Sequence, residues 1–419
     1  MKPTQSALDT ENLIADALVQ PLDLKAYSLG RRLTALFPDR TVVQGTEYSF
    51  DLDGFVADGH CTAILRPEMF QHLAISFAGL GEGLHETAQN AWYEVHWQGK
   101  TLQVVLVTWA EGGCNSSNYW LVAETESVAK EFYLCVCEWA AEVLVFDNGM
   151  WYKAENLFKA IKNTTFANLV LPSRLKQEIQ EDFAQFFASR AVYERYRLPW
   201  KRGVLLMGPP GNGKTHTVKA LINWLKVPCL YVKSFKARHS TDQISIRAVF
   251  ERARHTTPCI LVMEDLDSLI DDRNRSFFLN ELDGFAANTG ILVLATTNHP
   301  ERLDPALINR PSRFDRKYHF ELPEEAERYA YLEAWNQAME RELQTTPAAI
   351  TTTAAATEGF SFAYLKELCL SAMMRWISRP ERSNMETVLA EQSALLREQM
   401  SAMHEALPRE TDPAEDEEE

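Results

Sequence analysis

The sequence predicts an α/β protein whose central part is a parallel β-sheet flanked by helices, with an α+β domain before it and a helical domain after it. Two observations carry this prediction. From about residue 156, short runs that are β-rich and apolar on both faces alternate with helical stretches, as the central strands of a parallel sheet do. Beyond Pro323 the chain is mostly helical up to about residue 407, with a Thr/Ala-rich interruption at residues 345–357.

The first 155 residues have a different texture. Residues 1–40 show helical apolar spacing, residues 128–145 have the pattern of a buried helix, and Asp147-Asn148-Gly149 is typical of a hairpin turn. Nothing in this part has catalytic spacing, so we expect a domain that binds a partner. Short β-like runs separated by turn residues occur at 48–56, 92–97, 102–109 and 119–123. The strands expected in the central part are 204–207, 229–232, 259–263 and 291–296.

Bulk properties restrict the function classes. The 419 residues carry a net charge of −16 and end in an acidic run, so we expect a solvated tail at residues 408–419 and no general nucleic-acid binder. The seven cysteines are dispersed without a CxxC pair, which indicates reduced thiols and no zinc site. Residues 1–24 lack a secretory h-region, and no run of about 18 apolar residues predicts a membrane span. We therefore expect a cytoplasmic protein.

A glycine-rich segment, GPPGNGKT at residues 208–215, joins an apolar run to a helical stretch. In such a loop, glycines let backbone N–H groups converge on phosphate oxygens at a helix N-terminus. We expect Lys214 to reach the β- and γ-phosphates of ATP and the Thr215 hydroxyl to bind Mg²⁺. The residues expected to contact the nucleotide are Gly208, Pro209, Pro210, Gly211, Asn212, Gly213, Lys214, Thr215 and His216.

Polar side chains follow the next two apolar runs. Glu264 and Asp265 come after the run at 259–263, and Asn298 follows the run at 291–296. Acids at the carboxyl end of a parallel strand point into the ligand crevice, where one can hold a Mg²⁺-bound water and the other can polarise the attacking water. Asn298 can orient that water. Arg310 and Arg313, three residues apart, carry planar guanidinium groups that suit phosphate.

Together these segments resemble the AAA family of ATPases, with its AAA+ P-loop NTPase core and helical lid. The resemblance covers about residues 156–378 and is carried by GPPGNGKT, ILVMEDLDSL, LATTN, LDPALINRPSRFD and EGFSFAYLKEL. It divides the chain into an N-terminal domain (1–155), an α/β nucleotide-binding subdomain (156–322), a helical lid (323–407) and the acidic tail (408–419).

The resemblance also implies roles. Glu264 and Asp265 match the Walker B acids, with Glu264 on the metal side and Asp265 activating water, and Asn298 matches the sensor-1 residue. Arg310 and Arg313 match the arginine fingers, which act on ATP bound in a neighbouring subunit. A homo-oligomeric ring, most often a hexamer, is therefore expected.

Two features are similar to one subgroup of the family. They are the order Glu264-Asp265, in place of the usual Asp-Glu, and the leader from Leu169 to Gly203 with its LPWKRG end. The subgroup is that of the mitochondrial chaperone that moves the folded Rieske protein across the inner membrane during complex III assembly. Because no membrane span is expected here, we interpret the chain as a soluble relative with a different N-terminal domain. An Asp in the water-activating position is one methylene shorter than Glu, which implies slower hydrolysis.

The segment KSFKARHSTD at residues 233–242 occupies the place of the loop with which protein-threading rings grip their substrate. Two interpretations stay open. Phe235 grips an extended polypeptide, or Lys233, Lys236 and Arg238 form a basic ring without a grip.

We therefore expect an ATP hydrolase that couples hydrolysis to remodelling or translocation of a protein client recruited by residues 1–155. Two alternatives are an ATP-gated assembly switch with little turnover and a nucleic-acid remodeller that uses the basic loop.

Overall fold

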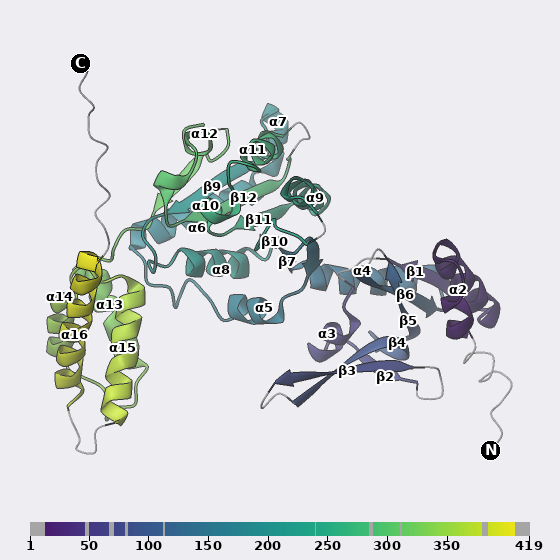
Figure 1. Ribbon diagram of the computed structural model, residues 1–419, viewed down its shortest axis with the longest axis horizontal. Coiled ribbons are helices and arrows are strands. Elements are labelled where there is room, and N and C mark those ends of the chain that lie inside the picture. The colour runs from purple at the N-terminus through teal and green to yellow at the C-terminus, as the bar shows by residue number, and fades with distance from the viewer. Residues whose placement is uncertain are drawn as a thin grey trace. The chain divides into compact units, whose positions relative to one another are not determined.

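Figure 1 shows the computed structural model of the chain, which describes residues 13–46, 50–66, 71–79, 83–111, 114–238, 240–284, 288–310, 312–378 and 384–406. These residues form two compact units. The first contains the described residues up to Val145 together with Met150–Ala154, and the second contains Phe146–Gly149 and the described residues from Glu155 onward. The acidic segment 408–419, for which the sequence predicts a tail, lies outside the described residues.

An antiparallel sheet organises the first unit, with the strand order β1-β6-β5-β4-β2 and with β3 paired to β4. Its strands are β1 (Thr41–Gly45), β2 (Thr62–Leu65), β3 (His72–Gly79), β4 (Gly83–Trp97), β5 (Lys100–Glu111) and β6 (Cys114–Ala123), and its helices are α2 (Leu22–Leu36), α3 (Leu52–Ala57) and α4 (Glu126–Ala141).

The central strands β4, β5 and β6 bury apolar side chains on both faces of the sheet. Trp92, Val105 and Trp120 are aligned across β4, β5 and β6 and pack in one core cluster with α2. The adjoining row, which includes Val104 and Leu121, belongs to a second cluster with α3 and α4. Because successive side chains of a strand point to opposite faces, each face carries its own helices.

The strands predicted at 92–97, 102–109 and 119–123 are confirmed as parts of β4, β5 and β6. The strand predicted at 48–56 is wrong, because α3 occupies part of it. The Asp51 carboxylate accepts a hydrogen bond from the Gly54 N–H at 2.9 Å, and such a cap favours a helix start at this position over an extended strand.

The second unit is built on the sheet β13-β9-β12-β11-β10, and the hairpin of β7 and β8 continues it beyond β10. The pairs β10–β11, β11–β12, β12–β9 and β9–β13 are parallel, as the sequence predicts. The sequence pattern placed the hairpin in the N-terminal domain. Val143–Val145 and Met150–Ala154 lie in the first unit and the turn Phe146–Gly149 lies in the second, while β7 pairs with β10. The bounds are β7 (Val143–Asp147), β8 (Met150–Tyr152), β9 (Arg202–Met207), β10 (Cys229–Val232), β11 (Cys259–Met263), β12 (Ile291–Thr297) and β13 (Arg316–His319).

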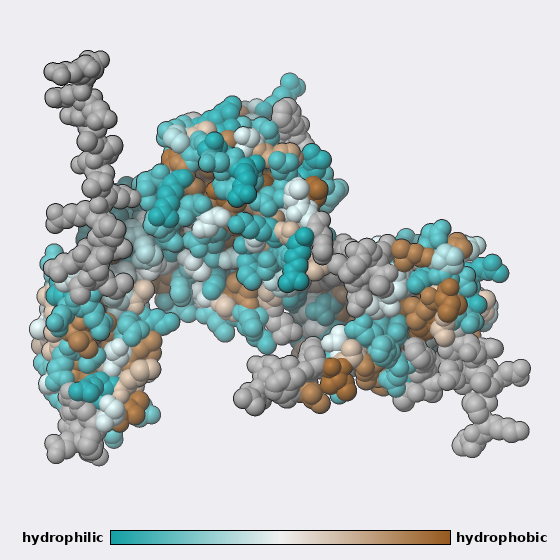
Figure 2. Space-filling model, in the orientation of Figure 1, coloured by the Kyte–Doolittle hydropathy of each residue, from teal (hydrophilic) through white to brown (hydrophobic). Residues whose placement is uncertain are grey.

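Every residue of β11 and β12 is buried, because helices connect the parallel strands and cover them (Figure 1). The visible face of this unit is mostly hydrophilic (Figure 2). The helices are α5 (Glu155–Lys162), α6 (Ser173–Ala188), α7 (Arg190–Tyr196), α8 (Lys214–Leu225), α9 (Asp242–His255), α10 (Leu266–Leu269), α11 (Arg275–Asp283), the 3₁₀ helix η1 (Pro300–Arg302) and α12 (Pro305–Ile308).

Four helices complete the second unit: α13 (Glu325–Gln337), α14 (Pro347–Ala356), α15 (Phe362–Ile377) and α16 (Met385–Ala406). The Thr/Ala-rich stretch expected to interrupt the helices is itself the helix α14, so that prediction is wrong. Thr346 caps its N-terminus, and the hydroxyls of Thr351, Thr352 and Thr353 donate to carbonyl oxygens four residues earlier. These bonds satisfy the threonine hydroxyls without breaking the helix. None of the helices in the described part of the chain has both the length and the apolar character required to cross a membrane.

The helical lid offers a matched pair of leucines on α15. Leu365 is fully buried, whereas Leu370 is 46% exposed. We predict that Leu365→Ala lowers the free energy of unfolding by about 2–5 kcal/mol, while Leu370→Ala changes it by less than about 0.5 kcal/mol. Urea denaturation followed by circular dichroism measures both. Equal losses for the two variants would contradict the packing described.

Candidate functional site

The phosphate loop joins β9 to α8 in the backbone conformation that its glycines permit. Gly208, Gly211 and Gly213 have φ angles of +142°, +81° and +91°, which side chains with a Cβ rarely adopt. Space is restricted as well. A Cβ on Gly208 would lie 2.1 Å from the Phe320 carbonyl oxygen, and one on Gly211 would lie 2.7 Å from the Ala363 Cβ. The loop is therefore packed closely between the residue that follows β13 and the first turn of α15.

Lys214 is the first residue of α8 and is only 6% exposed. Its ammonium donates to the carbonyl oxygens of Gly208 at 2.6 Å and Pro209 at 2.9 Å. Burial lowers the pKa of Lys214, and the charges of Asp265 and Asp267 oppose that shift. The ammonium is thus held against the loop where phosphate oxygens are expected.

The two acids after β11 have different surroundings. Asp265 is exposed and has a φ of +49°. Its N–H donates to Thr296 Oγ1 at 3.0 Å, and its carboxylate accepts from Asn298 Nδ2 at 2.9 Å. Two bonds from β12 and its C-terminal end therefore hold Asp265 in a left-handed conformation that is unfavourable for a non-glycine residue.

Glu264 points to the neighbouring strand instead. One of its carboxylate oxygens accepts a hydrogen bond from the Tyr231 hydroxyl on β10. The other oxygen, Oε1, is buried and has no hydrogen-bond partner among the described residues. Burial and the Glu264 charge raise the pKa of Tyr231, so the phenol remains a neutral donor.

A cavity of about 590 Å³ lies in front of the loop. It brings together the predicted residues Lys214, Thr215, Asp265 and Asn298, whereas Glu264 is not among its lining residues. Its size is that of a nucleotide-class ligand. The remaining lining residues come from the loop, the segment before α6, α8, β12 and the lid: Asn168, Leu169, Val170, Pro210, Gly211, Gly213, His216, Thr296, Tyr331, Phe362, Ala363 and Lys366.

His216 and Lys366 also line this cavity; the sequence pattern does not indicate a role for Lys366. Burial lowers the pKa of His216, and the charges of Lys219 and Lys366 lower it further. The imidazole is therefore neutral near pH 7. Lys366, on α15, brings a positive charge from the lid to the cavity.

The oxygen donors beside the cavity fit Mg²⁺, which favours carboxylate, hydroxyl, water and phosphate oxygens. Thr215 lines the cavity. Glu264 precedes the lining residue Asp265, and its buried Oε1 has no partner among the described residues, so a Mg²⁺-bound water would satisfy this acceptor. Across the described ranges, His, Cys, Asp and Glu side chains do not gather in groups of three or more that could hold a metal. Mg²⁺ held mainly by nucleotide phosphates and water needs no such group.

The two predicted arginines differ sharply in exposure. The side chain of Arg313 is 7% exposed; its Nε and Nη2 donate to the two carboxylate oxygens of Asp283 at 3.0 and 2.8 Å. The side chain of Arg310 is 60% exposed, and Nη1 donates to Asp283 at 3.1 Å. Arg313 is therefore held by a contact within the chain, while the side chain of Arg310 is largely exposed to solvent.

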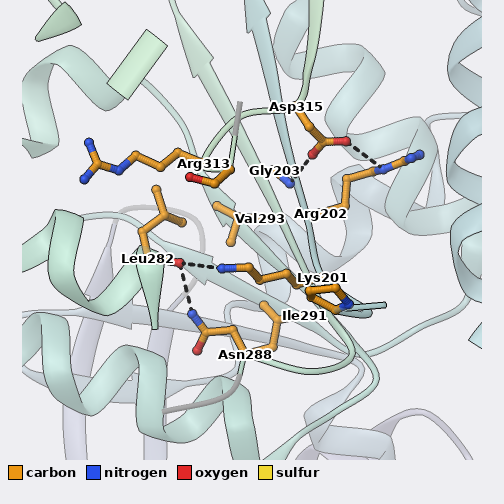
Figure 3. Close-up of a pocket in the computed structure, with 11 residues that line it drawn as sticks. Lys201, Arg202, Gly203, Leu282, Asn288, Ile291, Val293, Arg313 and Asp315 are labelled. Carbon is orange, nitrogen blue, oxygen red and sulfur yellow. Dashed lines mark hydrogen bonds and ion pairs between the residues drawn. The ribbon is translucent and has the colours of Figure 1, made fainter. Parts of the chain in front are cut away.

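The end of α11, which carries Asp283, is held in turn by Lys201 and Asn288. Both donate to the Leu282 carbonyl oxygen, at 3.4 and 3.3 Å (Figure 3). They border a cavity of about 220 Å³ with Arg313. This cavity lies where β9 begins, about 17 Å from the phosphate loop at the strand's other end, so it is separate from the nucleotide site.

The loop after β10 is bound to the β7–β8 turn. The Lys233 N–H donates to the Phe146 carbonyl at 3.0 Å, and the Arg238 N–H donates to Asn148 Oδ1 at 3.1 Å. Phe235 is 1% exposed and packs against Phe278. Phe235 is thus a core residue in this structure, while the side chains of Lys236 and Arg238 are exposed.

The sequence pattern does not indicate a role for several residues of these networks, among them Tyr231, Asp283 and Lys366. Tyr231 stands in an apolar strand, where its hydroxyl is the one signal of a polar role. Asp283 and Lys366 are charged residues in helices, which the pattern alone does not separate from solvated positions.

The arginine pair gives a stability test. Arg313→Ala leaves Asp283 with fewer partners in a partly buried place, so we predict that the free energy of unfolding falls by about 3 kcal/mol. Arg310→Ala, at an exposed pair, costs less than about 1 kcal/mol. The Arg313 bond lowers the pKa of Asp283 below its usual 3.8, so this contribution is full above that pH and is lost as the pH falls through the lowered pKa. Urea denaturation at pH 7 and pH 5 should give the same ranking.

Comparison with known proteins agrees with this geometry. Residues 204–322 match the model of the ATPase family associated with various cellular activities (AAA). The ribosome biogenesis ATPase RIX7 of Saccharomyces cerevisiae is 33% identical over 184 residues, which are 41% of this chain and 22% of that protein. An ATP-dependent zinc metalloprotease FtsH of Acaryochloris marina is 32% identical over 240 residues, 53% of this chain and 36% of that protein.

A putative cell division cycle ATPase of Plasmodium falciparum is 30% identical over 231 residues, 51% of this chain and 18% of that protein. The chain therefore spans well under half the length of these relatives. The matched segment contains the phosphate loop, both acids, Asn298 and both arginines. Residues 204–322 are therefore similar in sequence to the ATPase domain of the AAA family.

Proposed function

We propose that this protein hydrolyses ATP in a Mg²⁺-dependent reaction, within a homo-oligomeric ring that is most often a hexamer in this family. We propose further that it uses the energy to remodel or translocate a protein partner. The carrying observation is the cavity where Lys214, Thr215, Asp265 and Asn298 meet at the carboxyl edge of the parallel sheet.

Each residue has a distinct task in this proposal. Lys214 and the loop N–H groups bind the phosphates, and Thr215 and Glu264 hold Mg²⁺, which neutralises charge on the phosphates when bound. Asp265 accepts a proton from the attacking water. Asn298, hydrogen-bonded to Asp265 at 2.9 Å, orients that water and keeps the carboxylate in place.

Arg310 supports action between subunits. Its side chain is 60% exposed, and its Nη1 donates to the Asp283 carboxylate at 3.1 Å. A guanidinium that reaches the γ-phosphate in the next subunit stabilises the charge of the transition state. Arg313 then acts as its support, because both arginines bond to Asp283.

Three further parts of the proposal concern the subgroup, the client-binding domain and the cellular compartment. We infer kinship with the subgroup of the complex III assembly chaperone from the Glu264-Asp265 order and the 169–203 leader. The N-terminal sheet domain is the proposed client-binding part, and a cytoplasmic setting is proposed from the dispersed cysteines. The buried Phe235 favours rearrangement of a client without an aromatic grip.

A second candidate is an ATP-gated switch with little turnover. The observation that favours it is Asp265 at the cavity, since its side chain is one methylene shorter than that of a Glu and reaches less far into the cavity. Stoichiometric ATP binding with negligible phosphate release would decide for the switch.

The hydrolysis proposal predicts a defined pattern of losses. Lys214→Ala abolishes ATP binding, and Asp265→Asn lowers kcat by about 10²–10⁴-fold because the proton acceptor is lost. Removal of Mg²⁺ with EDTA stops phosphate release. Steady-state phosphate release measures each rate, and Lys219→Ala, one turn further along α8, is the control that retains activity. Activity unchanged in Lys214→Ala and Asp265→Asn would refute the proposal.

The trans role of Arg310 predicts complementation between two defective variants. Arg310→Ala and Asp265→Asn are each nearly inactive alone. In an equimolar mixed ring, about one site in four combines an intact Asp265 with a neighbour's Arg310, so about a quarter of the wild-type rate returns. Arg174→Ala, at a side chain that is 90% exposed on α6, serves as the control with full activity. Mixed rings that stay inactive would show that Arg310 does not act across the interface.

A further inference from the structure

Tyr231 and Glu264 meet because of the sheet register. Tyr231 on β10 is aligned with Val262 on β11. Glu264 follows Val262 by two residues, and residues two apart in an extended strand share a face. The phenol therefore reaches past Val262 to the carboxylate that stands just beyond the end of β11.

This contact gives the two oxygens of the Glu264 carboxylate different surroundings. One accepts from the Tyr231 hydroxyl, and the other, Oε1, is buried without a hydrogen-bond partner in the described part of the chain. A buried carboxylate oxygen without a donor is unfavourable. Oε1 can therefore accept a hydrogen bond from a ligand. A water bound to Mg²⁺ is a strong hydrogen-bond donor and could supply that bond.

The residue on the metal side is a Glu, which has one more rotatable bond than the Asp usual in the family. A longer side chain has more positions and loses more entropy when it is held in one of them. The Tyr231 bond removes that freedom, because it holds one oxygen and leaves the other as the available acceptor. Partners of this kind orient metal ligands elsewhere in proteins.

We propose that Tyr231 is a positioning residue for Mg²⁺-nucleotide binding: its hydroxyl holds Glu264 so that Oε1 receives a metal-bound water. This inference rests on the proposed Mg²⁺-dependent function of the same site. It assigns to β10 a role in the metal site, in addition to the acids after β11 and the Thr215 hydroxyl.

The test is a Mg²⁺ titration of nucleotide binding by the full chain, with fluorescent N-methylanthraniloyl-ATP as the probe. For Tyr231→Phe, the MgCl₂ concentration at half-maximal effect should rise by about 10–100-fold. Binding of the probe in EDTA should stay within about twofold of wild type, because no metal contact is involved there. That metal-free binding also reports whether the variant is folded.

Tyr318→Phe is the matched control. Tyr318 on β13 donates to the Asp182 carboxylate, so the variant loses the same kind of bond on the same sheet but away from the cavity. Its Mg²⁺ requirement should equal that of wild type. Glu264→Asp keeps the Tyr231 ring and shortens the carboxylate, so it tests the same contact if Tyr231→Phe does not fold.

Glu264→Asp should also raise the Mg²⁺ requirement, and the double variant Glu264→Asp/Tyr231→Phe should be no weaker than Glu264→Asp alone, because the two residues act as a pair. A Mg²⁺ requirement in Tyr231→Phe that equals or lies below that of wild type overturns the inference. Additive losses in the double variant also overturn it. If wild-type protein binds the probe without any Mg²⁺ dependence, the proposed function itself fails.

Discussion

The register of three parallel strands is the constraint on which the site depends. Met207, the last residue of β9, is aligned with Thr297, and Met263, the last of β11, is aligned with Ala295 on β12. The residues that follow these strands therefore emerge at one edge of the sheet: the phosphate loop, the two acids and Asn298. A slip of one register position would shift one of these groups by about 3.3 Å along the strand, more than a hydrogen bond tolerates.

The parallel sheet, and the places of the candidate residues at its edge, could be predicted from the sequence because strong local patterns mark them. A strand that is buried on both faces is apolar throughout, and the phosphate loop needs glycine at fixed spacing. The wrong predictions fall where local pattern and tertiary context disagree. Residues 48–56 look β-like but start a helix after Asp51, and α14 is rich in threonine, a weak helix former whose hydroxyls are satisfied within the helix.

The hydrogen-bond and packing partners of these side chains were harder to predict from the sequence than their positions in the fold. The sequence placed Arg310 and Arg313 together but could not show that Asp283, some thirty residues earlier, buries one of them and leaves the other exposed. Phe235 likewise follows a strand in the expected loop, and only its packing against Phe278 shows that it belongs to the core. Such contacts join distant segments, and no spacing rule encodes them.

The phosphate loop is in direct contact with the N-terminal end of α15, the third helix of the lid. The Ala363 N–H donates to the Gly211 carbonyl at 3.0 Å, and a Cβ at Gly211 would collide with that helix. This contact lies at one end of α15. The next helix of the lid, α16, has 22 residues and is about 33 Å long. A rotation of the lid about this contact would therefore displace the residues far from the loop more than those next to it.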